Sequence, residues 1–277
     1  MNVIWIASYP RSGNTWMRML LHDVLFGPAE SSESMNRMIP DIHRMPRLPI
    51  HRKGGILVKT HFCLRPEHPY LMQTGGCIYL IRNPRDVAIS AVRYARLFNA
   101  AQGDSAAFIR AYIERGGIEE WLNNGFGTWE QHAGSWINPP NLPRVVVRYE
   151  NLRNDTAAEL GRVCEFLGVD ASPEKIAGAV GRNEIDRLRK MEDREKQNNR
   201  CWFPGSVEQL KMGTRFFNEG RTGQRLDDIE PGLDALFDER FGEAMRRHGY
   251  ASDVCEASPC EPEHGQRRRG VRSTMRA

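Results

Sequence analysis

The amino-terminal stretch joins an apolar run, a short polar loop and an amphipathic segment. Residues 3–8 are almost all apolar, and residues 9–13 are mostly small or polar. From Asn14 onward apolar side chains recur at helical spacing, and Gly27-Pro28 ends the pattern as a helix C-terminus would. The pattern predicts a strand, a tight loop and a helix, in that order.

Three further apolar runs end abruptly in polar residues: Ile56–His61, Cys77–Arg82 and Val145–Glu150. Asn83-Pro84, after the second of them, is typical of a helix start. Because continuous apolar runs alternate with helical patterns, we predict a single α/β domain with a buried central parallel sheet flanked by helices. The polar strand ends should face the ligand crevice.

The remaining segments are less regular. Residues 28–55 are rich in proline and predict a long ordered loop or short helical pieces. We expect helices near Ala106–Glu114 and Thr128–Ile137, and a last core helix near Leu233–Met245. Residues 195–227 mix Asn, Gly, Arg and aromatic residues, which favours a mobile lid.

Length and charge place the domain at residues 1–254, because 277 residues suit one large domain. The formal net charge is +4, and residues 261–277 alone carry +3. A basic tail could touch nucleic acid or a membrane. Residues 255–277 have few apolar side chains, however, so we expect a disordered tail and neither partner.

The six cysteines show no C-x-x-C spacing, so we expect neither a zinc site nor a disulfide framework, and no other metal. No apolar run approaches 18 residues and no signal peptide is visible, which predicts a soluble cytoplasmic protein. The choice between monomer and homodimer stays open.

The first loop has the chemistry of an anion site. The first N–H groups of a helix lack internal partners and lie at the positive end of its dipole. Arg11 adds a charge, Gly13 allows close approach of the backbone, and Ser12, Asn14 and Thr15 add donors. These residues predict a phosphate-like ligand. The loop is not the nucleoside-triphosphate loop G-x-x-x-x-G-K-[ST], because the second glycine and the Lys-Ser/Thr pair are missing.

Residues 8–16 (SYPRSGNTW) resemble the 5′-phosphosulfate loop of sulfotransferases that use 3′-phosphoadenosine 5′-phosphosulfate (PAPS), with Arg11 where the family usually has lysine. The resemblance assigns Trp16 to the nucleotide as well. Val58–His61 (VKTH) resembles the family's lysine-threonine-histidine motif. Lys59 and His61 share one face of an extended strand, although a lone histidine at a strand end is more often only a structural hydrogen-bonding group.

Two more blocks support the resemblance. Residues 81–90 (IRNPRDVAIS) are similar to the family's 3′-phosphate segment, which assigns Arg82 and Ser90 to that phosphate; pairing of Arg82 with Asp86 is the structural alternative. Residues 129–136 and 148–152 resemble a paired-tryptophan helix and a tyrosine-glutamate strand end. Carried over, Tyr149 and Trp16 flank the adenine, with core packing as the alternative.

The carboxyl-terminal half departs from the family. The family usually has a basic pair before the glycine at Gly220, but this chain has Asn218-Glu219 there. Two residues after Asn183 this chain has Ile185, where the family often has phenylalanine. A 3′-phosphate held by Arg82 and Ser90 alone would be poorly compensated. We expect Arg221 to supply the missing charge. Arg215 and Arg225 are alternatives, and all three arginines could instead be solvated or paired with neighbouring carboxylates.

The resemblance implies a PAPS-dependent sulfotransferase with a P-loop-like fold that acts on a hydroxyl of a small molecule. His61 would be the general base, and Lys59 and Arg11 would neutralise the leaving phosphate. Length resembles that of small soluble bacterial enzymes that tailor antibiotics such as glycopeptides. Residues 28–53, 99–128 and 195–214 would form the acceptor surface. The alternatives are a small-molecule kinase and a catalytically inert nucleotide- or partner-binding protein.

Overall fold

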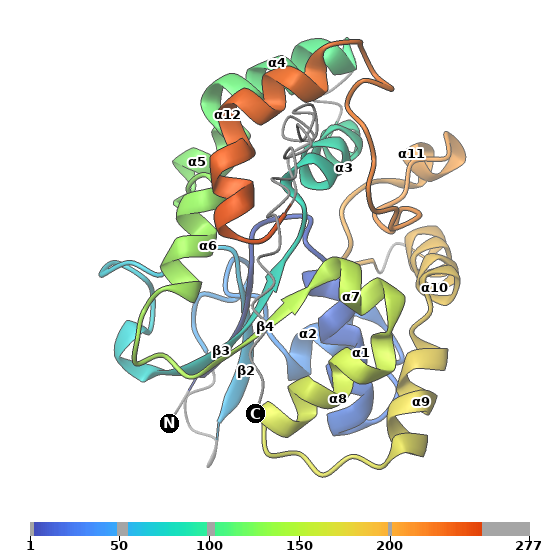
Figure 1. Ribbon diagram of the computed structural model, residues 1–277. Coiled ribbons are helices and arrows are strands. Elements are labelled where there is room, and N and C mark those ends of the chain that lie inside the picture. The colour runs from blue at the N-terminus through green and yellow to red at the C-terminus, as the bar shows by residue number, and fades with distance from the viewer. Residues whose placement is uncertain (1–2, 49–54, 99–102, 199–200, 251–277) are drawn as a thin grey trace, which may run out of the picture.

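The four strands of the computed structural model form one parallel sheet in the order β2-β1-β3-β4 (Figure 1). The structure describes residues 3–48, 55–98, 103–198 and 201–250. The strands are β1 (Val3–Ser8), β2 (Ile56–Thr60), β3 (Thr74–Ile81) and β4 (Arg144–Arg148). This arrangement confirms the predicted α/β fold with a central parallel sheet.

Side chains that alternate along β1 and β3 enter two separate cores, one on each face of the sheet. Trp5 and Tyr79 enter the first core, which packs beneath α3 (Pro84–Arg96), α4 (Ser105–Arg115), α6 (Trp129–Ile137) and α12 (Leu233–Arg247). Ile6 and Leu80 enter the second, beneath α1 (Asn14–Phe26), α2 (Ser32–Met38), α8 (Thr156–Phe166) and α9 (Pro173–Arg182). Figure 1 shows the two helix layers on opposite sides of the sheet.

Helix starts follow the capping residues of the sequence. The Asn83 side chain accepts a hydrogen bond from the Arg85 N–H (2.9 Å), with Pro84 in the first turn of α3. Thr128 and Gln131 form a capping box at the start of α6. The remaining helices are α5 (Glu119–Asn123), α7 (Tyr149–Asn154), α10 (Ile185–Gln197), α11 (Val207–Lys211) and a short 3₁₀ turn, Leu71–Gln73.

The structure adds detail to three predicted segments, and α2 is one of the short helical pieces expected in residues 28–55. Residues 28–48 contain α2, and Pro40–Ile42 then runs beside β2, where the Lys59 N–H donates to the Pro40 carbonyl (2.8 Å). The fourth strand stops at Arg148, because Tyr149 already begins α7. The predicted lid contains the end of α10 and all of α11. The predicted tail, 255–277, lies outside the described residues.

The described residues include Cys63, Cys77, Cys164 and Cys201, which are all free thiols. Within the same residues, no group of three or more His, Cys, Asp or Glu side chains could hold a metal ion. None of the described helices has the length and apolar character that a membrane crossing needs.

Candidate active site

The loop between β1 and α1 is held in an unusual backbone conformation. Arg11 and Gly13 both adopt left-handed φ values, 68° and 92°. The buried Asn14 amide ties the loop down by donating to the Ile6 carbonyl (2.8 Å) and the Ser8 hydroxyl (3.2 Å). A Cβ at Gly13 would lie 2.7 Å from the Tyr149 ring, so this position requires glycine. The start of α1 is thereby presented to the pocket.

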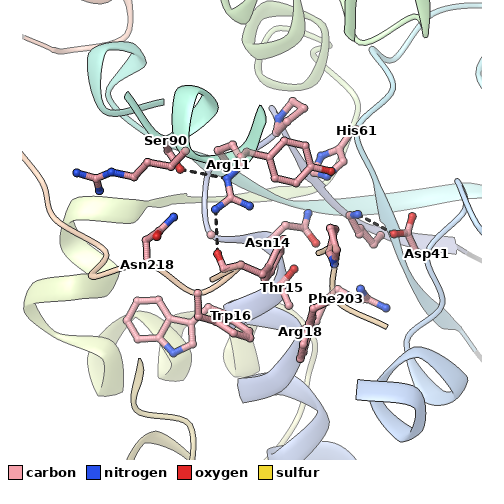
Figure 2. Close-up of a pocket in the computed structure, with 18 of the residues that line it drawn as sticks. Arg11, Asn14, Thr15, Trp16, Arg18, Asp41, His61, Ser90, Phe203 and Asn218 are labelled. Atoms are coloured by element: carbon pink, nitrogen blue, oxygen red, sulfur yellow. Dashed lines mark hydrogen bonds and ion pairs between the residues drawn. The ribbon is translucent and has the colours of Figure 1, made fainter. Parts of the chain in front are cut away.

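Arg11 lies across the middle of this pocket (Figure 2). Its Nε donates to the Ser90 hydroxyl (3.1 Å) and its Nη2 donates to the Phe216 carbonyl (3.1 Å). Burial lowers the pKa of the Arg11 guanidinium to about 10, so the group still carries its charge at neutral pH. Both partners are neutral. The charge of Arg11 is therefore available to an anion.

Arg82 at the end of β3 is a second buried cation beside the loop. It donates to the carbonyls of Arg11 (2.9 Å) and Arg221 (2.7 Å), and its guanidinium lies 4.2 Å from the centre of the Tyr149 ring. Its Nε is buried and has no hydrogen-bond partner among the residues that the structure describes. Asp86 does not pair with it: that carboxylate accepts from the backbone N–H groups of Gly223 and Gln224. A buried guanidinium in these surroundings fits an anionic ligand.

Lys59 is positioned by a residue that sequence patterns did not indicate. Its Nζ lies 2.7 Å from Oδ2 of Asp41, and both side chains are largely buried. Burial lowers the pKa of Lys59, whereas the nearby carboxylate opposes that shift. The ammonium group therefore lines the pocket as half of an ion pair.

His61 follows β2 and faces the same pocket. Its Nδ1 lies 2.7 Å from the Ser8 carbonyl, so Nδ1 carries the proton and Nε2 keeps a free lone pair. Burial lowers the pKa of His61 well below 6.5, which keeps the ring neutral at neutral pH. The His61 N–H donates to His43 Nε2 (2.8 Å), and the two rings stack. The His61 ring is thereby fixed in position and tautomer.

The residues predicted to contact the adenine line the same pocket as Arg11 and His61. The rings of Trp16 and Tyr149 meet edge to face at 6.2 Å, and both side chains line the pocket. The Trp16 Nε1 donates to the Asn183 carbonyl (2.9 Å), and the Tyr149 hydroxyl donates to the Gly220 carbonyl (3.3 Å). Ile185 lines the same region.

Every predicted site residue except Ser12 lines this pocket, whose volume is about 350 Å³. The Ser12 side chain is fully buried, and its hydroxyl has no partner within the described part of the chain, so only its backbone can face a ligand. The Arg221 side chain is 64% exposed and pairs with Glu219. All three segments expected at the acceptor surface contribute to the lining: Asp41, His43 and Arg44; Glu120, Trp121, Asn124 and Phe126; Trp202, Phe203 and Pro204.

The paired tryptophans of α6 hold two strand ends in place. The Trp129 indole donates to the Arg82 carbonyl (3.1 Å), and the Trp136 indole donates to the Phe62 carbonyl (2.9 Å), one residue after His61. His132, between them, is fully buried with its Nδ1 3.0 Å from the Tyr79 hydroxyl. These side chains support the ends of the strands that carry the site, and they do not line the pocket.

The fold and the loop define a class: parallel α/β proteins with an anion-binding loop after the first strand. The profile of the sulfotransferase domain matches residues 2–249, and the chain belongs to this family. The chain is 24% identical to mouse sulfotransferase 2A1 over 257 residues, which cover 87% of this chain and 83% of the relative. It is 26% identical to zebrafish cytosolic sulfotransferase 1 over 266 residues, 88% and 82% of the two chains.

Solved structures share the fold. Mouse sulfotransferase SULT7A1, complexed with 3′-phosphoadenosine 5′-phosphate (PAP), has a TM-score of 0.63 and 20% identity, with coverage of 91% of this chain and 85% of its own. Retinol dehydratase in complex with androsterone and the inactive cofactor PAP has a TM-score of 0.64 and 20% identity, covering 88% and 80%.

Proposed function

We propose that this protein transfers a sulfuryl group from PAPS to a hydroxyl group of a small-molecule acceptor. The observation that carries the proposal is the meeting in one pocket of two arginines, the partly buried Arg11 and the buried Arg82, with a neutral histidine. Two cations that bond only to neutral groups suit the phosphates of a nucleotide. A histidine with a free Nε2 suits deprotonation of a hydroxyl.

The nucleotide would lie along the first loop. The backbone of residues 12–15 and Arg11 would hold the 5′ end, Arg82 and Ser90 the 3′-phosphate, and Trp16, Tyr149, Ile185 and Gly220 the adenosine side. The orphaned Nε of Arg82 fits such a ligand, because an unpaired buried donor is costly. The PAP complexes of structural relatives support the choice of nucleotide.

His61 would remove the acceptor proton at Nε2 as the acceptor oxygen bonds to sulfur and the bond from sulfur to the 5′-phosphate oxygen breaks. General-base catalysis of this kind contributes about 10²–10⁴-fold in rate. Arg11 and Lys59 would stabilise the charge that grows on the departing phosphate oxygen. Because Lys59 is paired with the Asp41 carboxylate, its charge would stabilise the departing oxygen less than the charge of Arg11 would.

The acceptor side of the pocket mixes aromatic and polar side chains, which supports a small molecule that has both apolar surface and polar groups. Trp121, Phe126 and Trp202 supply the aromatic part, and Asn124, Glu120 and Arg44 the polar part. We propose a natural product with an aromatic or alicyclic hydroxyl, as in the antibiotic-tailoring enzymes that the sequence resembles.

Incubation with sulfur-labelled PAPS and a panel of hydroxylated natural products tests the reaction, with γ-labelled ATP and Mg²⁺ as the parallel arm. Transfer of label from PAPS alone is the expected result, and transfer from ATP alone would support a small-molecule kinase. Thermal unfolding tests the donor separately: PAP should raise the melting temperature far more than AMP does. A larger shift with PAP but no transfer to any acceptor would favour an inert nucleotide-binding protein.

A further inference from the structure

Two polar side chains face the pocket without a role in the motifs or in the proposed mechanism. Arg93 follows Ser90 by three residues on α3, so the two share one helix face, and both line the pocket. Asn218 reaches the pocket from the lid. We propose that Arg93 and Asn218 complete the subsite for the donor's 3′-phosphate, in place of the basic pair that this chain lacks. The inference rests on the proposed use of PAPS.

The charge of the ligand requires a further cation. A phosphate monoester carries between about −1.5 and −2 charges at pH 7. Arg82 supplies one positive charge at this end of the pocket, and Ser90 supplies a neutral hydroxyl. Arg11 bonds to that hydroxyl, but the proposed function assigns its charge to the 5′ end of the nucleotide. A partly buried dianion opposite one guanidinium would remain undercompensated. Another cation on a rigid element would correct the imbalance.

Arg93 meets this requirement. It is half-buried, and its Nη2 donates to a neutral partner, the Gln224 side chain, at 3.3 Å. The Gln224 backbone N–H is itself held by Asp86 (3.0 Å), so the contact keeps Arg93 oriented over the pocket. Among the described residues it forms no ion pair with a carboxylate. Its planar guanidinium can bind two phosphate oxygens at once.

Asn218 provides a neutral donor at the first position of the missing basic pair. Its Nδ2 is buried and finds no partner among the described residues. Figure 2 shows this side chain directed into the space between Ser90 and Trp16. Leaving a buried amide donor unbonded is unfavourable, and a phosphate oxygen in this space would satisfy it.

Arg221 is placed differently. Its guanidinium is 64% exposed and paired with Glu219, and its backbone carbonyl, not its side chain, contacts Arg82 (2.7 Å). Its guanidinium therefore lies mainly in solvent beside Glu219, a carboxylate whose charge also acts on Arg93. The lid backbone at this point closes the subsite, whereas the fixed helix α3 supplies the cation.

Isothermal titration of the full chain with PAP and with AMP, which lacks the 3′-phosphate, tests the inference. Arg93→Gln should raise the Kd for PAP about 10- to 100-fold, as expected for loss of a charge-assisted bond, and leave the Kd for AMP within about two-fold. Asn218→Ala should raise the Kd for PAP about 3- to 10-fold. Arg96→Gln is the matched control, because Arg96 lies on the same helix and donates instead to the Ser105 hydroxyl.

Equal losses of PAP and AMP affinity in Arg93→Gln, or no loss of either, would overturn the inference. A loss selective for PAP in Arg221→Gln but absent from Arg93→Gln would also overturn it and would return the role to Arg221. If the unmutated protein binds PAP no better than AMP, the proposed donor fails. If the unmutated protein prefers PAP and both Arg93→Gln and Asn218→Ala keep that preference, the inference is rejected and the proposed donor is not.

Discussion

The Lys59 ammonium group lies 2.7 Å from the Asp41 carboxylate, and this contact ties the loop after α2 to the end of β2. Asp41→Asn would leave a largely buried lysine without its counter-charge. We expect a loss of about 3–5 kcal/mol in the free energy of unfolding, the range for a broken buried pair. Urea denaturation monitored by circular dichroism measures it.

The double variant Asp41→Leu/Lys59→Met serves as the control for this pair. Because it removes both charges together, it should be more stable than Asp41→Asn. A double variant that is less stable than Asp41→Asn would show that loss of the ion pair itself, and not the lysine charge left without a partner, causes the loss of stability.

His61 should be essential for turnover and dispensable for nucleotide binding. With its Nδ1 bonded to the Ser8 carbonyl, only Nε2 can accept a proton. His61→Gln should lower kcat by about 10²–10⁴-fold and leave the Kd for PAP within a few-fold. Release of PAP from PAPS, measured by chromatography, and isothermal titration separate the two effects.

His43 cannot substitute as the base in this arrangement, because its Nε2 accepts the His61 N–H and its Nδ1 then carries the proton. His51, a further histidine of the proline-rich segment, lies outside the described residues. Near-normal turnover in His61→Gln would therefore point to a base that the described pocket does not contain.

The sequence predicted the sheet, α1 and the first loop because their signals are local: an apolar run, a glycine at a left-handed position and a helical stripe. Asp41 escaped prediction because it pairs across 18 residues from an irregular, proline-rich segment. Glu192 escaped as well. It lies on α10 and accepts the backbone N–H groups of Phe216 and Phe217, the first of which holds Arg11 through its carbonyl. Only the folded chain brings these residues together.

Histidines that burial keeps neutral make the folded protein less stable as the pH falls. Burial lowers the pKa of His43 and of His68 to about 4, and that of His132 to about 3. Between these values and pH 6.5 the unfolded chain binds more protons than the folded chain, so stability rises with pH in this window. The melting temperature should fall steadily from pH 6.5 to 4, and His68→Gln should reduce the slope. A flat profile over this window would contradict the neutral burial of these rings.

The two glycines of the lid, Gly220 and Gly223, distinguish a close contact from backbone strain. Both have left-handed φ values, 65° and 68°, so alanine is strained at either position by roughly 1–2 kcal/mol. A Cβ at Gly220 would lie 2.7 Å from the Tyr149 hydroxyl, whereas a Cβ at Gly223 meets nothing within 4 Å. Gly220→Ala must therefore displace either the lid or the ring that supports Arg82. We expect Gly220→Ala to weaken the affinity for PAP by about 10-fold or more and Gly223→Ala to weaken it much less. Both variants should lower the melting temperature through backbone strain, and Gly220→Ala should lower it further through its added contact. Equal effects of the two variants on PAP affinity would show that strain in the lid, and not its contact with Tyr149, governs closure over the nucleotide.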